Sequence, residues 1–194
     1  MDLVLTGGNL IDPASGRSGK FDVGFSGNRV SEVAGKIDPE AAARVIDVSG
    51  KVVVPGLIDL HTHVYHGGTS LSVHADSLAR KAGVTTFVDA GSAGPGNFLG
   101  FHDHVIQSSR SRILAFLNIS HAGIFGFDVG VGECTEIALC NAVDTVERAR
   151  EYVGHIIGVK MRAIGVNGLH ALDIAKEASN KLALPLMAHI GTPP

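Results

Sequence analysis

From residue 57 onward, short apolar runs alternate with amphipathic stretches, and this alternation constrains the fold more than any other feature. The runs expected to form strands are Leu57 to His63, Val84 to Asp89, Ile113 to Ile119, Ile156 to Met161 and Pro185 to His189. Between them we expect helices at about 72–82, 97–108, 136–153 and 168–182. Because repeated strand–helix units build a parallel sheet with both faces covered, the sequence predicts an α/β protein.

The first 54 residues have a different character. Their apolar runs are short and broken by Gly, Asn, Asp or Pro, as in Leu3 to Ile11, Phe21 to Gly27 and Arg44 to Val54. Such runs are typical of a meander of short strands. We therefore expect a small N-terminal β-sandwich-type domain over residues 1–54, followed by a β/α domain over residues 55–194.

Alternation alone fits both an open doubly wound sheet and a (β/α)₈ barrel. The polar residues favour the barrel, because they lie at or near the C-terminal ends of the expected strands: His61, His63, Asp89, Lys160 and His189. In a barrel these ends form the face that carries the active site.

Composition excludes several classes of protein. The chain has 194 residues, 45% of them hydrophobic and 18% charged, which is typical of a soluble globular protein. The net charge is −3 and the Lys and Arg residues are scattered, so we expect no nucleic-acid or membrane partner but a small-molecule substrate. Neither a signal-like N-terminus nor a bilayer-spanning apolar run is apparent, which favours a cytoplasmic location. The spacing of Cys134 and Cys140 matches no zinc-finger pattern.

His61 and His63 are the first candidate metal ligands. Because one residue separates them on a strand, both side chains leave the same face with Cα atoms about 6.6 Å apart. Two imidazoles so placed can bind one ion, and zinc accepts histidine nitrogen readily. In a chain with ten histidines a chance pair is the alternative.

The segment Val52 to Gly68, VVVPGLIDLHTHVYHGG, gives this pair a context. It resembles the first barrel strand of the amidohydrolase superfamily, which ends in P-G-x-I-D-x-H-x-H. The resemblance extends over essentially the whole chain and is closest to the dihydroorotase-like branch and to metallohydrolases labelled deacetylases. It implies an incomplete (β/α)₈ TIM barrel of about five strands, with a centre of one or two divalent ions, zinc by preference.

Further site residues follow from the resemblance. Lys160 matches the lysine that captures CO₂ and bridges two metals as a carbamate, and His189 matches a ligand of the second metal. Asp59 lies two residues before His61 on the same strand face, where its carboxylate could orient an imidazole without binding the metal itself. A salt-bridged lysine, an ordinary polar histidine and a plain salt bridge are the respective alternatives.

Two further residues are candidates for substrate binding. Arg162 lies two residues beyond Lys160 on the same strand face, where its planar guanidinium could bind a substrate carboxylate. His121 follows the third expected strand and could also reach the substrate. The loop from Gly91 to Gly96 lacks both the P-loop ending and the dinucleotide-binding spacing, so we interpret it as a flexible loop near the site.

The family also uses a histidine from the sixth strand and a general-base aspartate from the eighth, and this chain stops at Pro194, before either. The first and fifth strands are then expected to have unpaired edges. We favour a fragment of a longer enzyme over a chain that completes its barrel with another chain or as a homo-oligomer.

The expected activity is hydrolysis of an amide, cyclic amide or ester bond by metal-activated water, with the 194-residue chain inactive alone. A non-catalytic metal-binding or scaffold protein of the same fold is the main alternative. A metal-free open α/β binding module is a weaker one.

Overall fold

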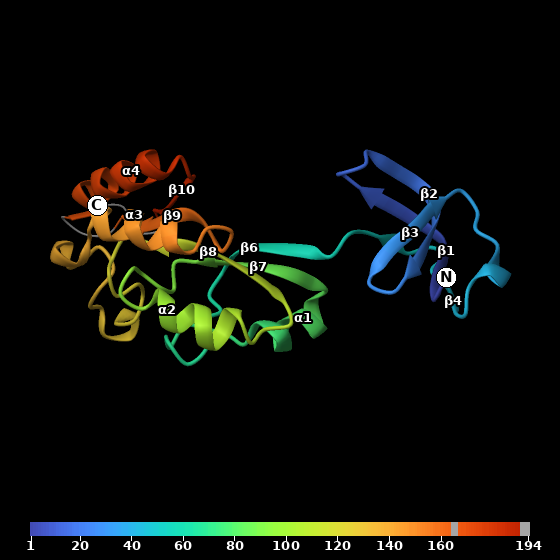
Figure 1. Cartoon of the computed structure of the whole chain (residues 1–194), viewed down its shortest axis with the longest axis horizontal. Coiled ribbons are helices and arrows are strands. Elements are labelled where there is room, and N and C mark those ends of the chain that lie inside the picture. Colours follow the sequence, from blue (N-terminus) through green and yellow to red (C-terminus); the bar gives the residue numbers. More distant parts are fainter. Residues whose placement is uncertain (164–166, 191–194) are drawn as a thin grey trace. The chain divides into compact units, whose positions relative to one another are not determined.

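The computed structural model describes residues 1–163 and 167–190. The chain forms two compact units, Met1–Gly56 and Leu57–Pro194 (Figure 1). Each unit has its own sheet.

The first unit is built on one mixed sheet. Its strands are β1 (Leu3–Asp12), β2 (Arg17–Ser26), β3 (Arg29–Ala34), β4 (Val45–Asp47) and β5 (Val52–Val53), and a 3₁₀ turn covers Pro39–Ala41. Strands β1, β2 and β3 form the expected antiparallel meander. Because β2 occupies one edge of β1, β4 and β5 return to the other edge and pair with it in parallel, which the meander interpretation did not anticipate.

The second unit contains five parallel strands, as the sequence predicted. They are β6 (Leu57–Thr62), β7 (Val84–Ala90), β8 (Arg112–Asn118), β9 (Ile156–Arg162) and β10 (Leu186–His189). Each strand pairs with the next one in the chain, which gives the spatial order β10-β9-β8-β7-β6. This consecutive order is that of a β/α barrel, whereas a doubly wound sheet reverses direction part-way.

Helices connect these strands near the expected positions. They are α1 (Ala75–Ala82), α2 (Phe98–Phe101), α3 (Ala142–Glu151) and α4 (Gly168–Leu182). The segment expected as one helix over 97–108 begins as α2 and continues as a π-helical turn, His102–Ile106. Short 3₁₀ turns at Phe127–Val129 and Ile137–Leu139 lie in the long connection between β8 and α3. None of the described helices is long and apolar enough to cross a membrane.

The sheet of the second unit curls into a half-barrel. His61 and His189 belong to the two strands at opposite edges of the sheet, β6 and β10, yet their ring centroids lie 6.0 Å apart. A flat five-stranded sheet would hold its edge strands about 19 Å apart, at some 4.8 Å per step. The expected incomplete TIM barrel is therefore confirmed.

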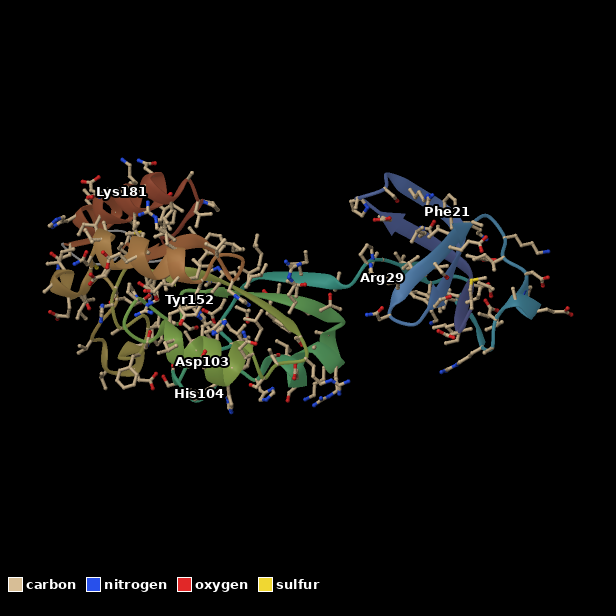
Figure 2. All side chains as sticks on the ribbon, in the orientation of Figure 1. Phe21, Arg29, Asp103, His104, Tyr152 and Lys181 are labelled. Carbon is tan, nitrogen blue, oxygen red and sulfur yellow. The ribbon has the colours of Figure 1, made fainter. Side chains whose placement is uncertain are left out.

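The apolar core lies between the sheet and its helices. On α4, Ala171, Ala175 and Ala178 are fully buried and pack with Val159 and Met161 of β9. Small side chains at this helical spacing let the helix backbone approach the strand closely. At the end of α3, the Tyr152 ring, labelled in Figure 2, lies 5.0 Å from the ring of Phe98 and so joins α3 to α2.

Candidate functional site

The C-terminal end of β6 carries the predicted histidine pair. His61 is the penultimate residue of β6, and His63 directly follows the strand. The ring centroids of the two histidines lie 6.0 Å apart. His189 reaches the same place from β10, with its ring also 6.0 Å from that of His61. The structure thus brings together three of the predicted ligands from both edges of the half-barrel.

A buried carboxylate fixes the orientation of His63. Asp89, at the end of β7, is fully buried and accepts hydrogen bonds from the backbone N–H groups of Val64 (2.8 Å) and Ser92 (2.7 Å). The Ser92 hydroxyl in turn lies 2.9 Å from Nδ1 of His63. In the tautomer in which Nδ1–H donates to this hydroxyl, the lone pair of Nε2 is left to bind an ion. From the sequence, Asp89 was noted only for its position at a strand end, and Ser92 was not singled out.

Lys160 lies in the interior of the half-barrel on β9 and is only 2% exposed. A Cβ atom at Gly91 would lie 2.6 Å from its Cγ, and Gly91 has φ +85°, so glycine is required where the β7 loop passes the lysine. Burial lowers the pKa of Lys160, and the nearby carboxylates of Glu133 and Asp89 partly oppose this shift.

Burial and positive neighbours keep the imidazoles neutral. Burial, followed by the charge of Lys160, lowers the pKa of His61, His63 and His189. The pKa of His63 falls to about 4. Neutral imidazole is the form that binds a metal ion, so these histidines are in the required state at neutral pH.

Arg162 extends from β9, two residues beyond Lys160. Its Nη1 lies 3.4 Å from Oε2 of Glu133, and its guanidinium carbon lies 5.2 Å from the ring centroid of Phe127. Glu133 belongs to the connection between β8 and α3 and is 6% exposed. It is separated from Arg162 by 29 positions, and no local pattern in the sequence signals it.

Two other predicted residues make different contacts. The Asp59 carboxylate accepts the backbone N–H of His61 at 3.2 Å, so it contacts the strand and not the imidazole. His121 is exposed, and its Nδ1 lies 3.6 Å from Oδ2 of Asp144 in α3. Within residues 1–163 and 167–190, no hydrogen bond or ring contact joins His121 to the histidine cluster.

Comparisons with known proteins place this geometry in a family. No family model matches the chain. A deacetylase of Agrobacterium fabrum is 36% identical over 170 residues, which cover 86% of this chain and 42% of that protein. A crystal structure of a dihydroorotase superimposes with a TM-score of 0.88 at 33% identity, covering 99% of this chain and 52% of that one. The chain corresponds to the N-terminal part of an amidohydrolase-superfamily protein.

Other amidohydrolases agree with this assignment. A dihydroorotase of Syntrophotalea carbinolica is 39% identical over 87 residues, or 45% of this chain and 20% of that protein. A crystal structure of an adenine deaminase has a TM-score of 0.82 at 28% identity, covering the whole of this chain and 51% of that one. The chain thus spans about half the length of the relatives it matches.

The donor set of this amidohydrolase half-site fits a metal centre in its chemistry. Within the described ranges, no group of three or more His, Cys, Asp and Glu side chains is arranged to hold one ion together. The ring of His61 is nonetheless close to those of both His63 and His189. The fourth predicted ligand, Lys160, becomes an oxygen donor only as a carbamate. Imidazole nitrogens and a carbamate oxygen are donor types that divalent ions accept.

Proposed function

We propose that the protein is a metal-dependent hydrolase that cleaves an amide, cyclic amide or ester bond of a small-molecule substrate. The observation that carries the proposal is the convergence of His61, His63 and His189 from opposite edges of the half-barrel, beside the buried Lys160. Strand ends of a β/α barrel are where catalytic groups are found. The deacetylase and dihydroorotase relatives support hydrolytic chemistry.

In this proposal His61, His63, Lys160 and His189 hold one or two divalent ions, with zinc the best match to imidazole donors. When bound, the ions would supply activated water and polarise the carbonyl of the scissile bond. Lys160 takes part as a carbamate: its neutral amine attacks CO₂, a C–N bond forms and one proton is released. Burial lowers the pKa of Lys160 and thereby increases the fraction of neutral amine.

The remaining residues orient the ligands and the substrate. Ser92 holds His63 in the tautomer that leaves Nε2 free, and Asp89 holds Ser92. Arg162 is placed to bind a substrate carboxylate through its planar guanidinium. No described residue corresponds to the general-base aspartate that the resemblance implies, so proton transfer to the leaving group is assigned to none of them.

One observation favours a second candidate function. Because the described residues supply ligands but no general base, the chain alone could bind metal without hydrolysis. That non-catalytic protein would keep stoichiometric metal and show no turnover.

The test replaces His61 with Ala in the complete protein. We expect loss of bound metal, measured by plasma mass spectrometry, together with loss of hydrolysis of acetylated compounds and of dihydroorotate, the substrates that the relatives' names indicate. His170→Ala is the matched control, since His170 is exposed on α4. Full metal content with undiminished turnover in the His61 variant would refute the proposal, and metal without turnover in the parent protein would favour the non-catalytic alternative.

A further inference from the structure

A pocket opens beside Arg162, next to the histidine cluster. Its volume is about 250 Å³, and its lining includes Phe127, Val131, Glu133 and Arg162. Arg162 of β9 is the register partner of His189 of β10, so the two residues are neighbours in adjacent strands. A group bound in this pocket would therefore lie near the proposed reaction centre.

Among the described residues, Arg162 makes hydrogen bonds with only one side of its guanidinium. Nη1 donates to Oε2 of Glu133 at 3.4 Å. Nε is buried and has no hydrogen-bond partner among the described residues. Arg162 lines the pocket and its side chain is 23% exposed, so the accessible part of the guanidinium can bind a carboxylate there.

Glu133 is not one of the proposed metal ligands, and two hydrogen bonds hold its carboxylate in place. Its Oε1 accepts from Nδ2 of Asn118 at 3.4 Å while Oε2 accepts from Arg162. Its backbone has φ +46°, a left-handed conformation that non-glycine residues rarely adopt. Buried acids are retained where they are paired, and backbone strain of this kind gathers at functional sites.

We infer that Glu133 is a positioning residue: it fixes one side of Arg162 so that the accessible part of the guanidinium faces a carboxylate in the pocket. The inference rests on the proposed function only in that it takes this pocket to be part of the substrate-binding site. Glu133 thereby determines the preference for anionic over neutral ligands through its contact with Arg162. Orientation before binding reduces the entropy lost when the carboxylate binds.

The test compares two probes that have no C–N bond to hydrolyse, benzoate and its neutral analogue acetophenone. Their dissociation constants are measured by calorimetry on the complete, metal-loaded protein. Glu133→Met removes the acceptor oxygens but keeps the side-chain length, whereas Glu133→Gln keeps one acceptor oxygen. Glu136→Ala, at an exposed position of the same connection, is the control. Arg162→Gln removes the proposed carboxylate contact.

We expect Glu133→Met to raise the dissociation constant of benzoate about tenfold and to change that of acetophenone by less than about twofold. Glu133→Gln should keep the preference for benzoate over acetophenone within about threefold of that of the parent protein. In the Arg162→Gln background, Glu133→Met should have no further effect on this preference, because Glu133 acts through Arg162.

Three results would overturn the inference: equal weakening of both probes, an effect of Glu133→Met that persists without Arg162, or a benzoate preference that survives Arg162→Gln. The last would place benzoate on the metal instead. If Glu133→Met does not fold, Glu133→Gln and Arg162→Gln still test the inference. Loss of the benzoate preference in Glu133→Gln would contradict it, because the amide oxygen of glutamine can still accept a hydrogen bond from Arg162. Failure of these binding results leaves the metal and turnover results of His61→Ala unaffected, so the two proposals fail separately.

Discussion

Replacing Asp89 with Asn should damage both the fold and the site. The Asp89 carboxylate accepts one backbone N–H on each oxygen, from Val64 at 2.8 Å and from Ser92 at 2.7 Å, in a fully buried environment. Asparagine has one acceptor oxygen, so its NH₂ group must face one of these N–H donors. A buried donor left without a partner costs about 1–3 kcal/mol, and the other hydrogen bond loses its charge assistance. The expected loss in the free energy of unfolding is about 3 kcal/mol.

The same change should weaken the metal centre, because Ser92 orients His63. Loss of an orienting partner behind a metal ligand lowers affinity about 10- to 100-fold. Urea unfolding followed by circular dichroism measures the stability, competition with a chromophoric chelator measures the affinity, and hydrogen exchange of the Val64 and Ser92 amides locates the damage. Asp173→Asn, at an exposed position on α4, is the control and should change stability by less than about 0.5 kcal/mol. If Asp89→Asn is equally mild and leaves exchange unchanged, the reasoning from these two hydrogen bonds is refuted.

Two further substitutions test the packing and electrostatics of the second unit. A Cβ atom at Gly158 would lie within van der Waals overlap of Phe116, so Gly158→Ala should destabilise by about 3 kcal/mol in thermal unfolding, whereas Gly35→Ala, with open space, should be near neutral. A backbone hydrogen bond from Arg110 holds the pKa of Asp76 well below its usual range. Because a depressed pKa stabilises the fold above the unfolded value near 3.8, and this stabilisation is lost progressively as pH falls from there through the folded pKa, Asp76→Asn should cost about 1 kcal/mol at pH 7 and clearly less at pH 2. An equal cost at both pH values would contradict that linkage.

The fold of the second unit could be predicted because its signal is local. Each parallel strand is a nearly continuous apolar run, such as Ile156 to Arg162, and each run is followed by a chain segment of helical periodicity. The parallel return of β4 and β5 to β1 could not be predicted, since it depends on which edge of β1 remains available. The π-helical turn His102–Ile106 depends on the packing of its side chains and has no signal in the apolar spacing.

The site divides in the same way. His61 and His63 face one side of a strand through their spacing alone, so their proximity followed from the sequence. The proximity of His61 and His189 depends on the curl of five strands, and only the family resemblance indicated it. Ser92 lies in the glycine-containing loop that was interpreted as flexible, and its contact with His63 spans 29 positions. Such contacts exist only once the strands have assembled.

In the proposed function, the charges around Lys160 link its conversion to a carbamate to metal binding. Asp89 and Glu133, both nearly or fully buried, lie close enough to raise the pKa of Lys160 against the effect of burial. Converting the amine to a carbamate replaces a positive charge by a negative one beside these two carboxylates. Arg162 already pairs with Glu133 and can offset only one of the resulting charges. Because an uncompensated buried anion is strongly disfavoured, the carbamate can persist only where divalent cations supply the missing positive charge. Lysine modification and metal uptake are therefore expected to occur together in this half-barrel.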